Sequence, residues 1–176
     1  QVINPGGNGI DLREIGDWFE FHGPIEVELT RPTSDYGILI ESSRSDCGAT
    51  FEWMSLSATD VRESALRVAG LGSFNAKGKI TAAGGARAIE LENSRIGVSL
   101  SGLEVLDAKR EGVLIHDVSG TLEVGTTTIR NSGAAGISIQ SMDGTAEFFK
   151  ADIATRGAAG IHARQTLRCN FRHLLR

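Results

Sequence analysis

Four residues with side chains suited to acid–base or anion-binding chemistry recur at an interval of about two dozen residues. Arg67 is followed by Glu90, and Glu92 is followed by His116. A carboxylate next to a histidine can form a general acid–base pair, and a nearby guanidinium binds anionic groups. We therefore predict a catalytic group of Arg67, Glu90, Glu92 and His116, provided that the fold brings these positions together. A solvated strand face would carry the same residue types without any function.

Six further residues are candidate ligand-binding positions around that group: Trp18, Asn93, Asp117, Gln140, His162 and Arg164. Trp18 opens the aromatic segment WFEF, which offers a ring for stacking against a sugar. The alternative for this segment is that it covers an open end of the fold.

Two glutamates at the same interval, Glu123 and Glu147, are the candidate metal ligands. If these carboxylates are neighbours, they either repel one another or share a cation, and Ca²⁺ is a cation that takes carboxylate oxygens. The expected cofactor is therefore Ca²⁺ or none. The alternative is that both glutamates are exposed charges that prevent sideways association of the protein.

A repeat that runs through most of the chain supplies the elements that would position these residues. A Gly/Ala-apolar-x-apolar phrase starts at residues 9, 37, 65, 88, 112, 136 and 160, at intervals of 28, 28, 23, 24, 24 and 24. Alternation with a period of two predicts a strand, and a repeat of this length predicts a solenoid. A second phrase, apolar-polar-apolar, is centred on Glu26, Glu52, Asn75, Ser99, Glu123 and Glu147. A third apolar position follows at Val105, Ile129 and Ile153.

These phrases predict an all-β fold, a single-stranded parallel β-helix of about six to seven coils, with three short strands per coil. The coil lengths are the repeat intervals themselves, from 23 to 28. Residues 1–165 would form the β-helix domain, and residues 166–176 a cap or a truncated coil. In each first strand the second and fourth residues would fill the core, and the third and fifth would face solvent. The third positions are Asp11, Leu39, Arg67, Glu90, Leu114, Ser138 and His162.

The composition limits the classes of function. The chain has 40% hydrophobic and 23% charged residues. This is the composition of a globular domain and not of a disordered one. The net charge of −4 argues against a general nucleic-acid partner, which needs clustered Lys and Arg. No apolar run approaches the ~20 residues that a membrane-spanning helix needs.

The segment GVLIHDVSGTLEVGTTTIRNSGAAGISI, residues 112–139, resembles the right-handed parallel β-helix repeats of the pectate-lyase-like superfamily. The resemblance extends over residues 9–165 and implies a right-handed coil. It also implies an extracellular or cell-surface protein whose partner is a carbohydrate polymer. In members that act on polysaccharides, the strand face is often the floor of the substrate groove.

Two functions are consistent with this resemblance. One is a protein that binds polysaccharide along an exposed strand face, with or without cleaving it; such an enzyme would be a polysaccharide lyase or a glycoside hydrolase. The other is a noncatalytic structural module of the adhesin or tailspike type. No characteristic lyase or epimerase motif accompanies the repeats, and the sequence leaves the choice open.

Overall fold

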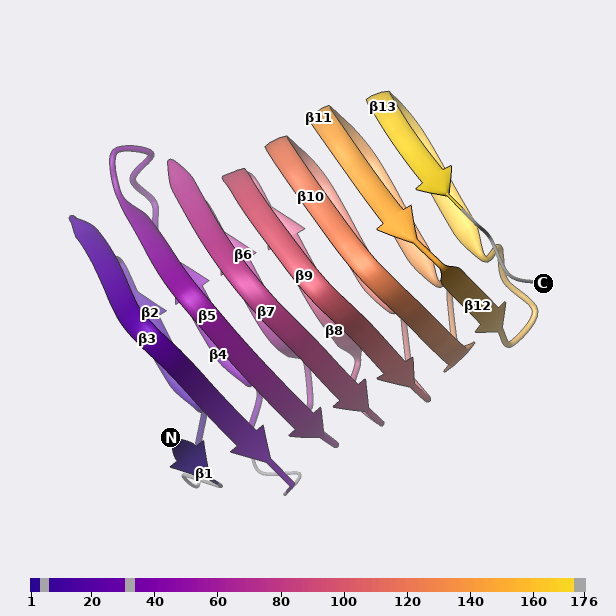
Figure 1. Ribbon diagram of the computed structural model, residues 1–176, viewed down its shortest axis with the longest axis horizontal. Coiled ribbons are helices and arrows are strands. Elements are labelled where there is room, and N and C mark those ends of the chain that lie inside the picture. The colour runs from indigo at the N-terminus through magenta and orange to yellow at the C-terminus, as the bar shows by residue number, and fades with distance from the viewer. Residues whose placement is uncertain (4–6, 31–33, 173–176) are drawn as a thin grey trace.

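The computed structural model describes residues 1–3, 7–30 and 34–172, with side chains described up to residue 165. Within these ranges the chain forms thirteen strands and no helix. The strands build one parallel sheet that winds into a β-solenoid of about seven turns, as the repeat predicts. Figure 1 shows the coils stacked side by side, with the N-terminus at one end of the stack and the C-terminus at the other.

Each early coil consists of one short and one long strand. The short strands are β2 (Ile10–Arg13), β4 (Ile38–Glu41), β6 (Ser64–Ala69) and β8 (Arg87–Glu92). The long strands are β3 (Trp18–Leu29), β5 (Gly48–Thr59), β7 (Ser73–Ala83) and β9 (Arg95–Leu106). The remaining strands are β1 (Val2–Ile3), β10 (Val113–Ser132), β11 (Ile137–Phe149), β12 (Ala151–Thr155) and β13 (Ile161–Arg172).

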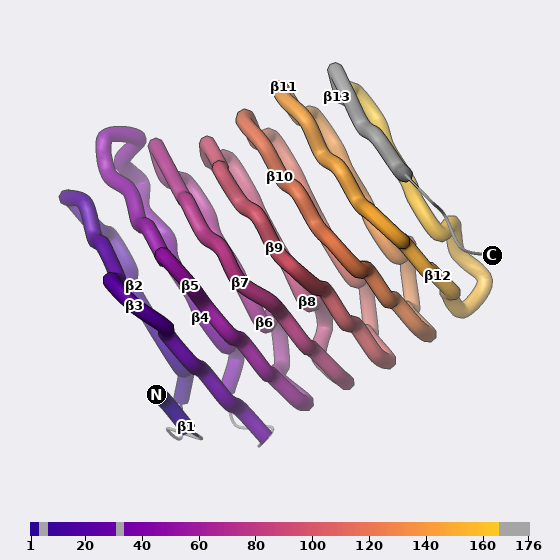
Figure 2. Tube along the Cα trace, in the orientation of Figure 1, coloured from indigo at the N-terminus to yellow at the C-terminus, as the bar shows by residue number. Residues whose placement is uncertain are grey.

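The long strands lie in one layer and the short strands in a second layer behind them, as the traces of Figures 1 and 2 show. The sheet order β1-β3-β5-β7-β9-β10-β8-β6-β4-β2 turns back at β10 because β10 passes through both layers. The second and third predicted strands of a coil are continuous, which makes each long strand about twice the expected length. β13 continues to Arg172 and therefore runs past the expected domain boundary at residue 165, while residues 173–176 lie outside the described part of the chain.

The inward residues of successive first strands form a single column. The register pairs Ile89 with Val113, Val113 with Ile137 and Ile137 with Ile161, which confirms the predicted stacking. Ile89, Val113 and Ile137 are at most 1% exposed. Burial of such aliphatic columns is the main source of stability in a solenoid, since each coil covers the apolar face of the next.

Single residues in the left-handed backbone region form the sharp corners of the coils, either after a strand or, in β10 and β11, within it. Asn93, Asp117 and Ser141 follow the first strands of three successive coils, with φ of 46°, 51° and 54°. Asp107 and Asn131 occupy the same conformation near the ends of long strands. Asn and Asp tolerate this conformation better than other non-glycine residues, which explains their recurrence there. One residue is enough to turn the chain.

The predicted alignment of the second phrase is wrong in the early coils. Glu26 pairs with Ser55 and not with Glu52. Asn75 pairs with Gly97, and Ser99 pairs with Lys77. The cause is a set of β-bulges, at which the register shifts between Phe51 and Met54 and again at Gly78. The pairing of Glu123 with Glu147 is as predicted.

Candidate functional site

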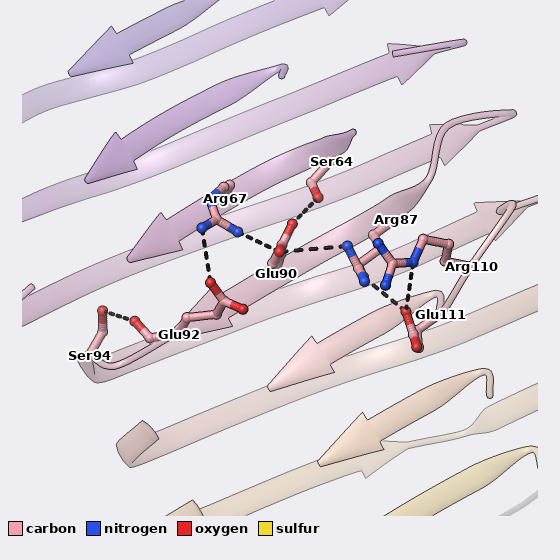
Figure 3. A network of polar contacts seen from close by, with 8 residues as sticks. All are labelled: Ser64, Arg67, Arg87, Glu90, Glu92, Ser94, Arg110 and Glu111. Atoms are coloured by element: carbon pink, nitrogen blue, oxygen red, sulfur yellow. Dashed lines mark hydrogen bonds and ion pairs between the residues drawn. The ribbon is translucent and has the colours of Figure 1, made fainter. Parts of the chain in front are cut away.

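Glu90 lies at the centre of a network of ion pairs on the short-strand layer (Figure 3). β6 and β8 place Arg67 beside Glu90 in register, as the sequence predicts. One carboxylate oxygen of Glu90 accepts a hydrogen bond from Ser64 Oγ at 2.5 Å. The other oxygen contacts Nη1 of Arg67 and lies 3.6 Å from Nη1 of Arg87. Both oxygens of Glu90 are therefore held by donors.

The network continues from Glu90 in both directions. On one side Arg67 Nη2 reaches Glu92 Oε2 at 2.9 Å. On the other side Arg87 Nε donates to Glu111 Oε2 at 2.9 Å, so that acidic and basic groups alternate across three successive coils. Figure 3 shows the side chains pointing toward one another above the sheet. Three of the predicted catalytic residues, Arg67, Glu90 and Glu92, thus pair with one another.

Burial in this network contradicts the expectation that all third positions face solvent. Glu90 is 6% exposed and Arg87 5%, because the long side chains of neighbouring coils enclose them. Leu39 and Ser138, two other third positions, are also buried. A general acid or base must reach the substrate, whereas Glu90 is buried and both of its carboxylate oxygens already have donors.

Tyr36 borders the network from the segment that precedes β4. Burial raises the pKa of its phenol, and the neighbouring charge of Arg67 opposes this shift while that of Glu90 adds to it. The backbone N–H of Tyr36 donates to Oδ1 of Asn8 at 2.9 Å, which connects this segment to the first coil.

Sequence reasoning missed Ser64, Arg87 and Glu111. Arg87 and Glu111 are 24 positions apart, the same interval as the repeat, which was the available signal. Both lie just before or at the start of a first strand, outside the positions that the alternation assigns to a face. Ser64 pairs in register with Arg87 at the start of β8, one coil away.

His116 stands one coil above Glu92 but bonds elsewhere. The register makes His116 the neighbour of Glu92 on one side and of Gln140 on the other. The imidazole Nε2 lies 2.8 Å from Oδ2 of Asp117, and both side chains are about half exposed. Glu92 and His116 are thus neighbours along the stack, while each carries a different partner.

The remaining predicted ligand-binding residues are distributed along the solenoid. Gln140 and Arg164 continue the row of His116, and His162 follows Ser138 in the adjacent row on β13. Trp18 lies in the first coil at the start of β3, in the long-strand layer, and is 55% exposed. The structure therefore brings Asn93, Asp117 and Gln140 close to the predicted catalytic group and separates Trp18, His162 and Arg164 from it.

Two polar hollows follow the corner where the first strands end. The first, of about 380 Å³, is bordered by Glu41, Arg67, Glu92 and Asn93 among others. The second, of about 550 Å³, is bordered by Asn93, Arg95, Asp117, Ser119 and Asp143 among others. Because both include Asn93, they adjoin, and together they form what we call the corner groove. The best candidate site is thus at the strand ends and not on the strand face.

Trp18 begins a row of paired residues whose later members, Arg95, Ser119 and Asp143, border the corner groove. Trp18 pairs with Gly48, and Gly48 pairs with Ser73. In the next coil the row continues with Arg95, which pairs with Ser119, and Ser119 pairs with Asp143. A Cβ added to Gly48 would lie 2.6 Å from a ring carbon of Trp18, so the absence of a side chain at Gly48 makes room for the indole.

Glu123 and Glu147 are register neighbours, as the candidate cation site requires. Ca²⁺ takes six to eight oxygen ligands, far more than two carboxylates supply. Across the described residues, no cluster of three or more His, Cys, Asp or Glu side chains has the geometry to hold a metal ion. The cation site therefore stays a prediction.

No family model, no curated protein and no solved structure matches this chain significantly. The likeness to pectate-lyase-like proteins consequently concerns the parallel solenoid architecture alone. In the part of the chain that the structure describes, no helix has the length and apolar character that crossing a membrane requires.

Proposed function

We propose that this protein is a noncatalytic β-solenoid that binds a polysaccharide along the corner groove, outside the cell or at its surface. The observation that carries the proposal is the pair of adjoining polar hollows, which extend along the stack and share Asn93. Their walls present carboxylates, guanidinium groups, an amide and hydroxyls, which together match the donors and acceptors of sugar hydroxyls.

The dimensions of the groove favour a polymer over a small molecule. From Trp18 to Asp143 the row covers five coil steps, or about 24 Å at the ~4.8 Å spacing between strands. A site for a small ligand is normally a concave pocket that encloses most of the ligand. An open, elongated groove suits a chain that lies along it. The exposed indole of Trp18, at the start of the row, offers a stacking surface for a polymer that extends beyond the groove.

The charges of the groove favour a neutral polysaccharide over a strongly anionic one. Five acidic residues border the two hollows, against two arginines: Glu14, Glu41, Glu92, Asp117 and Asp143 face Arg67 and Arg95. Arg67 already pairs with Glu90 and Glu92, which leaves Arg95 as the main cationic group on the wall. An anionic polymer would meet net repulsion there.

The same contacts support binding over cleavage. Glycoside hydrolysis normally needs two carboxyl groups on opposite sides of the bond that breaks. Here Glu90 is enclosed by Ser64, Arg67 and Arg87, and Glu92 pairs with Arg67. His116 contacts Asp117 instead of either glutamate.

A binding screen with neutral and anionic oligosaccharides tests this proposal. We expect a neutral oligosaccharide to shift NMR resonances of Asn93, Ser119 and Asp117 and to leave the sugar chain intact. Trp18→Ala should weaken binding about fivefold, which corresponds to about 1 kcal/mol of lost stacking. Trp53→Ala is the matched control, because Trp53 is similarly exposed, at 43%, but pairs with Pro24 and lies outside the row that runs from Trp18 toward the groove.

Two results would contradict the proposal. One is a screen in which only anionic sugars bind, or in which Trp18→Ala and Trp53→Ala weaken binding equally. The other is the release of new sugar ends that disappears in a Glu90→Gln variant, because this would make Glu90 a catalytic residue.

The structural alternative, an adhesin- or tailspike-like module, is favoured by a different observation. At both ends of the stack, the strands have a described partner on one side, except that β3 also meets the short strand β1 on its other side. A protein of this kind would bind no sugar in the screen above.

A further inference from the structure

The N-terminal end of the solenoid is a parallel sheet edge. Among the described residues, β2 pairs only with β4. β3 pairs with β5 along its length, and its other side meets only β1, opposite Val27 and Glu28. Within residues 1–3, 7–30 and 34–172, most of this edge has no paired strand on its outer side, and such an edge is a template for pairing.

Apolar side chains are exposed at the same edge. Leu12 is half-buried, although Ile40, which is its neighbour in the column, is fully buried. Phe19 is 38% exposed, while its column neighbour Ala49 is fully buried. The first coil thus leaves the end of the apolar core in contact with solvent, a cost that another coil would remove.

The C-terminal end is the complementary edge. Within the described part of the chain, β13 pairs only with β11, and β12 pairs only with β10. Ile161 is half-buried above the fully buried Ile137, as expected for the last layer of a column. Because every pairing in the sheet is parallel, this edge has the same strand direction as the N-terminal edge of a second copy.

The two edges also match in shape. β13 forms the first and second sides of the last coil, above β11. The third side of the preceding coil is β12. Among the described residues, β12 pairs with β10 on one side and has no paired strand on the side that faces the last coil. β1 lies on the corresponding third side of the opposite end, below Val27 and Glu28 of β3. In a stack of two copies, β1 of one copy would lie on β12 of the other and complete the coil that β13 begins.

The charges of the two ends are opposite. Residues 10–29 contain six acidic residues and one basic residue, whereas residues 150–172 contain five basic residues and one acidic residue. Residues that pair from coil to coil form rows along the stack. The row that contains Glu20 in the first coil contains Arg168 in the last, and the row that contains Asp11 in the first coil contains His162 in the last. Continuing the stack would therefore place Glu20 next to Arg168 and Asp11 next to His162.

One row brings like charges together, because Arg13 would follow Arg164. Arg13 already pairs with Asp11 at 2.8 Å, which reduces this repulsion. The overall charges of the two ends, six acidic residues and one basic against five basic and one acidic, still favour association.

We propose that this protein associates head to tail with further copies of itself, so that β13 and β12 of one copy pair with β2, β3 and β1 of the next. Such a contact joins two different surfaces. It leaves a free edge at each end of the assembly and therefore produces open chains instead of closed dimers. This interaction is independent of sugar binding in the corner groove.

Sedimentation velocity of the full chain over a range of concentrations and salt tests this proposal. The expected result is a weight-average mass that rises above 18.7 kDa with concentration, passes the mass of a dimer and falls again at high salt. A mass that stays at 18.7 kDa up to millimolar concentration and at low salt would overturn the proposal. A plateau at twice that mass would also overturn it, because it indicates a closed dimer.

Charge reversal identifies the surfaces. Glu20→Arg alone and Arg168→Glu alone should each weaken association roughly tenfold, and the double variant should restore it. Glu104→Arg is the control, because Glu104 is an exposed acidic residue on β9, in the middle of the stack, and its reversal should leave association unchanged. If the double variant associates no better than the single ones, or if Glu104→Arg weakens association equally, the head-to-tail contact is wrong. Circular dichroism establishes that each variant is folded.

Discussion

At the scale of the residue, Glu90 shows how a group with catalytic chemistry acquires a structural role. Its position in the repeat points away from the core, but Arg67, Arg87 and Ser64 enclose it. This carboxylate contacts two guanidinium groups, one of which, that of Arg87, is almost fully buried. The removal of Glu90 would leave the buried Arg87 with Glu111 as its one acidic partner and Arg67 with Glu92 alone.

Glu90→Ala should therefore lower the free energy of unfolding by about 3 kcal/mol, because the buried Arg87 loses a partner. Glu92→Ala should cost at most about 1 kcal/mol, since the Glu92–Arg67 pair is partly solvated. Urea unfolding of the two variants and the parent chain measures this difference. Equal losses, or none for Glu90→Ala, would show that the network contributes little to stability.

At the scale of the element, the bends of the long strands depend on glycines whose environment excludes a side chain. Gly78 has φ of 149°, and a Cβ there would lie 1.8 Å from the carbonyl oxygen of Met54. Gly102 is different: its backbone is unrestricted and the nearest atom to an added Cβ is 3.7 Å away. Gly102 instead borders a third hollow of about 400 Å³ together with Lys79, Glu104 and Thr126.

The two glycines form a matched pair for mutation. Gly78→Ala should destabilise the protein by at least about 2 kcal/mol, because the backbone conformation and the carbonyl of Met54 both oppose a side chain. Gly102→Ala should change stability by less than about 1 kcal/mol, and in the stabilising direction, since it only restricts the unfolded chain. Thermal and urea unfolding measure both effects. A larger loss for Gly102→Ala would contradict this account of the bends.

The repeat predicts the fold well where the coil length is constant. Five of the seven first strands follow one another at intervals of 23 or 24, and alternation alone places Ile89, Val113, Ile137 and Ile161 in one column. The second phrase fails because a bulge adds a residue to one strand without changing the coil length, and an interval cannot reveal this. Around Gly78 the alignment is therefore displaced by two residues.

For the candidate site, the sequence predicts which residues are neighbours along the stack, but not which side chains bond to each other. The interval places Arg67 beside Glu90 and His116 beside Glu92, and the register agrees. The partner that each side chain selects depends on rotamers and on competing charges such as Arg87, which the alternation does not assign to a face. For this reason, the sequence suggests an acid–base pair where the structure has a closed ion-pair network.

At the scale of the whole molecule, the solenoid is a one-dimensional stack in which each coil contacts only the coils above and below it. The central coils have neighbours on both sides, and the end coils have a described neighbour on one side only. Stability should consequently vary along the stack, since local opening begins where the fewest contacts must break.

Hydrogen exchange should show this gradient. In dilute protein, we expect the slowest amide exchange in β7, β9 and the first half of β10, and the fastest in β2 and β13. At high concentration, head-to-tail association should slow exchange in β2 and β13 and leave the central strands unchanged. Uniform exchange along the chain at low concentration would show that the molecule opens as a single cooperative unit.

The one-residue corners have a further consequence for how this protein can change in evolution. Deleting Asn93 or Asp117 would shift the following strand by one position and turn its apolar side chains toward the water. Duplicating one whole repeat, in contrast, would add a complete turn and preserve every inward position. Such a molecule can grow or shrink in whole turns, and any ligand lying along it would gain or lose contacts by the same step.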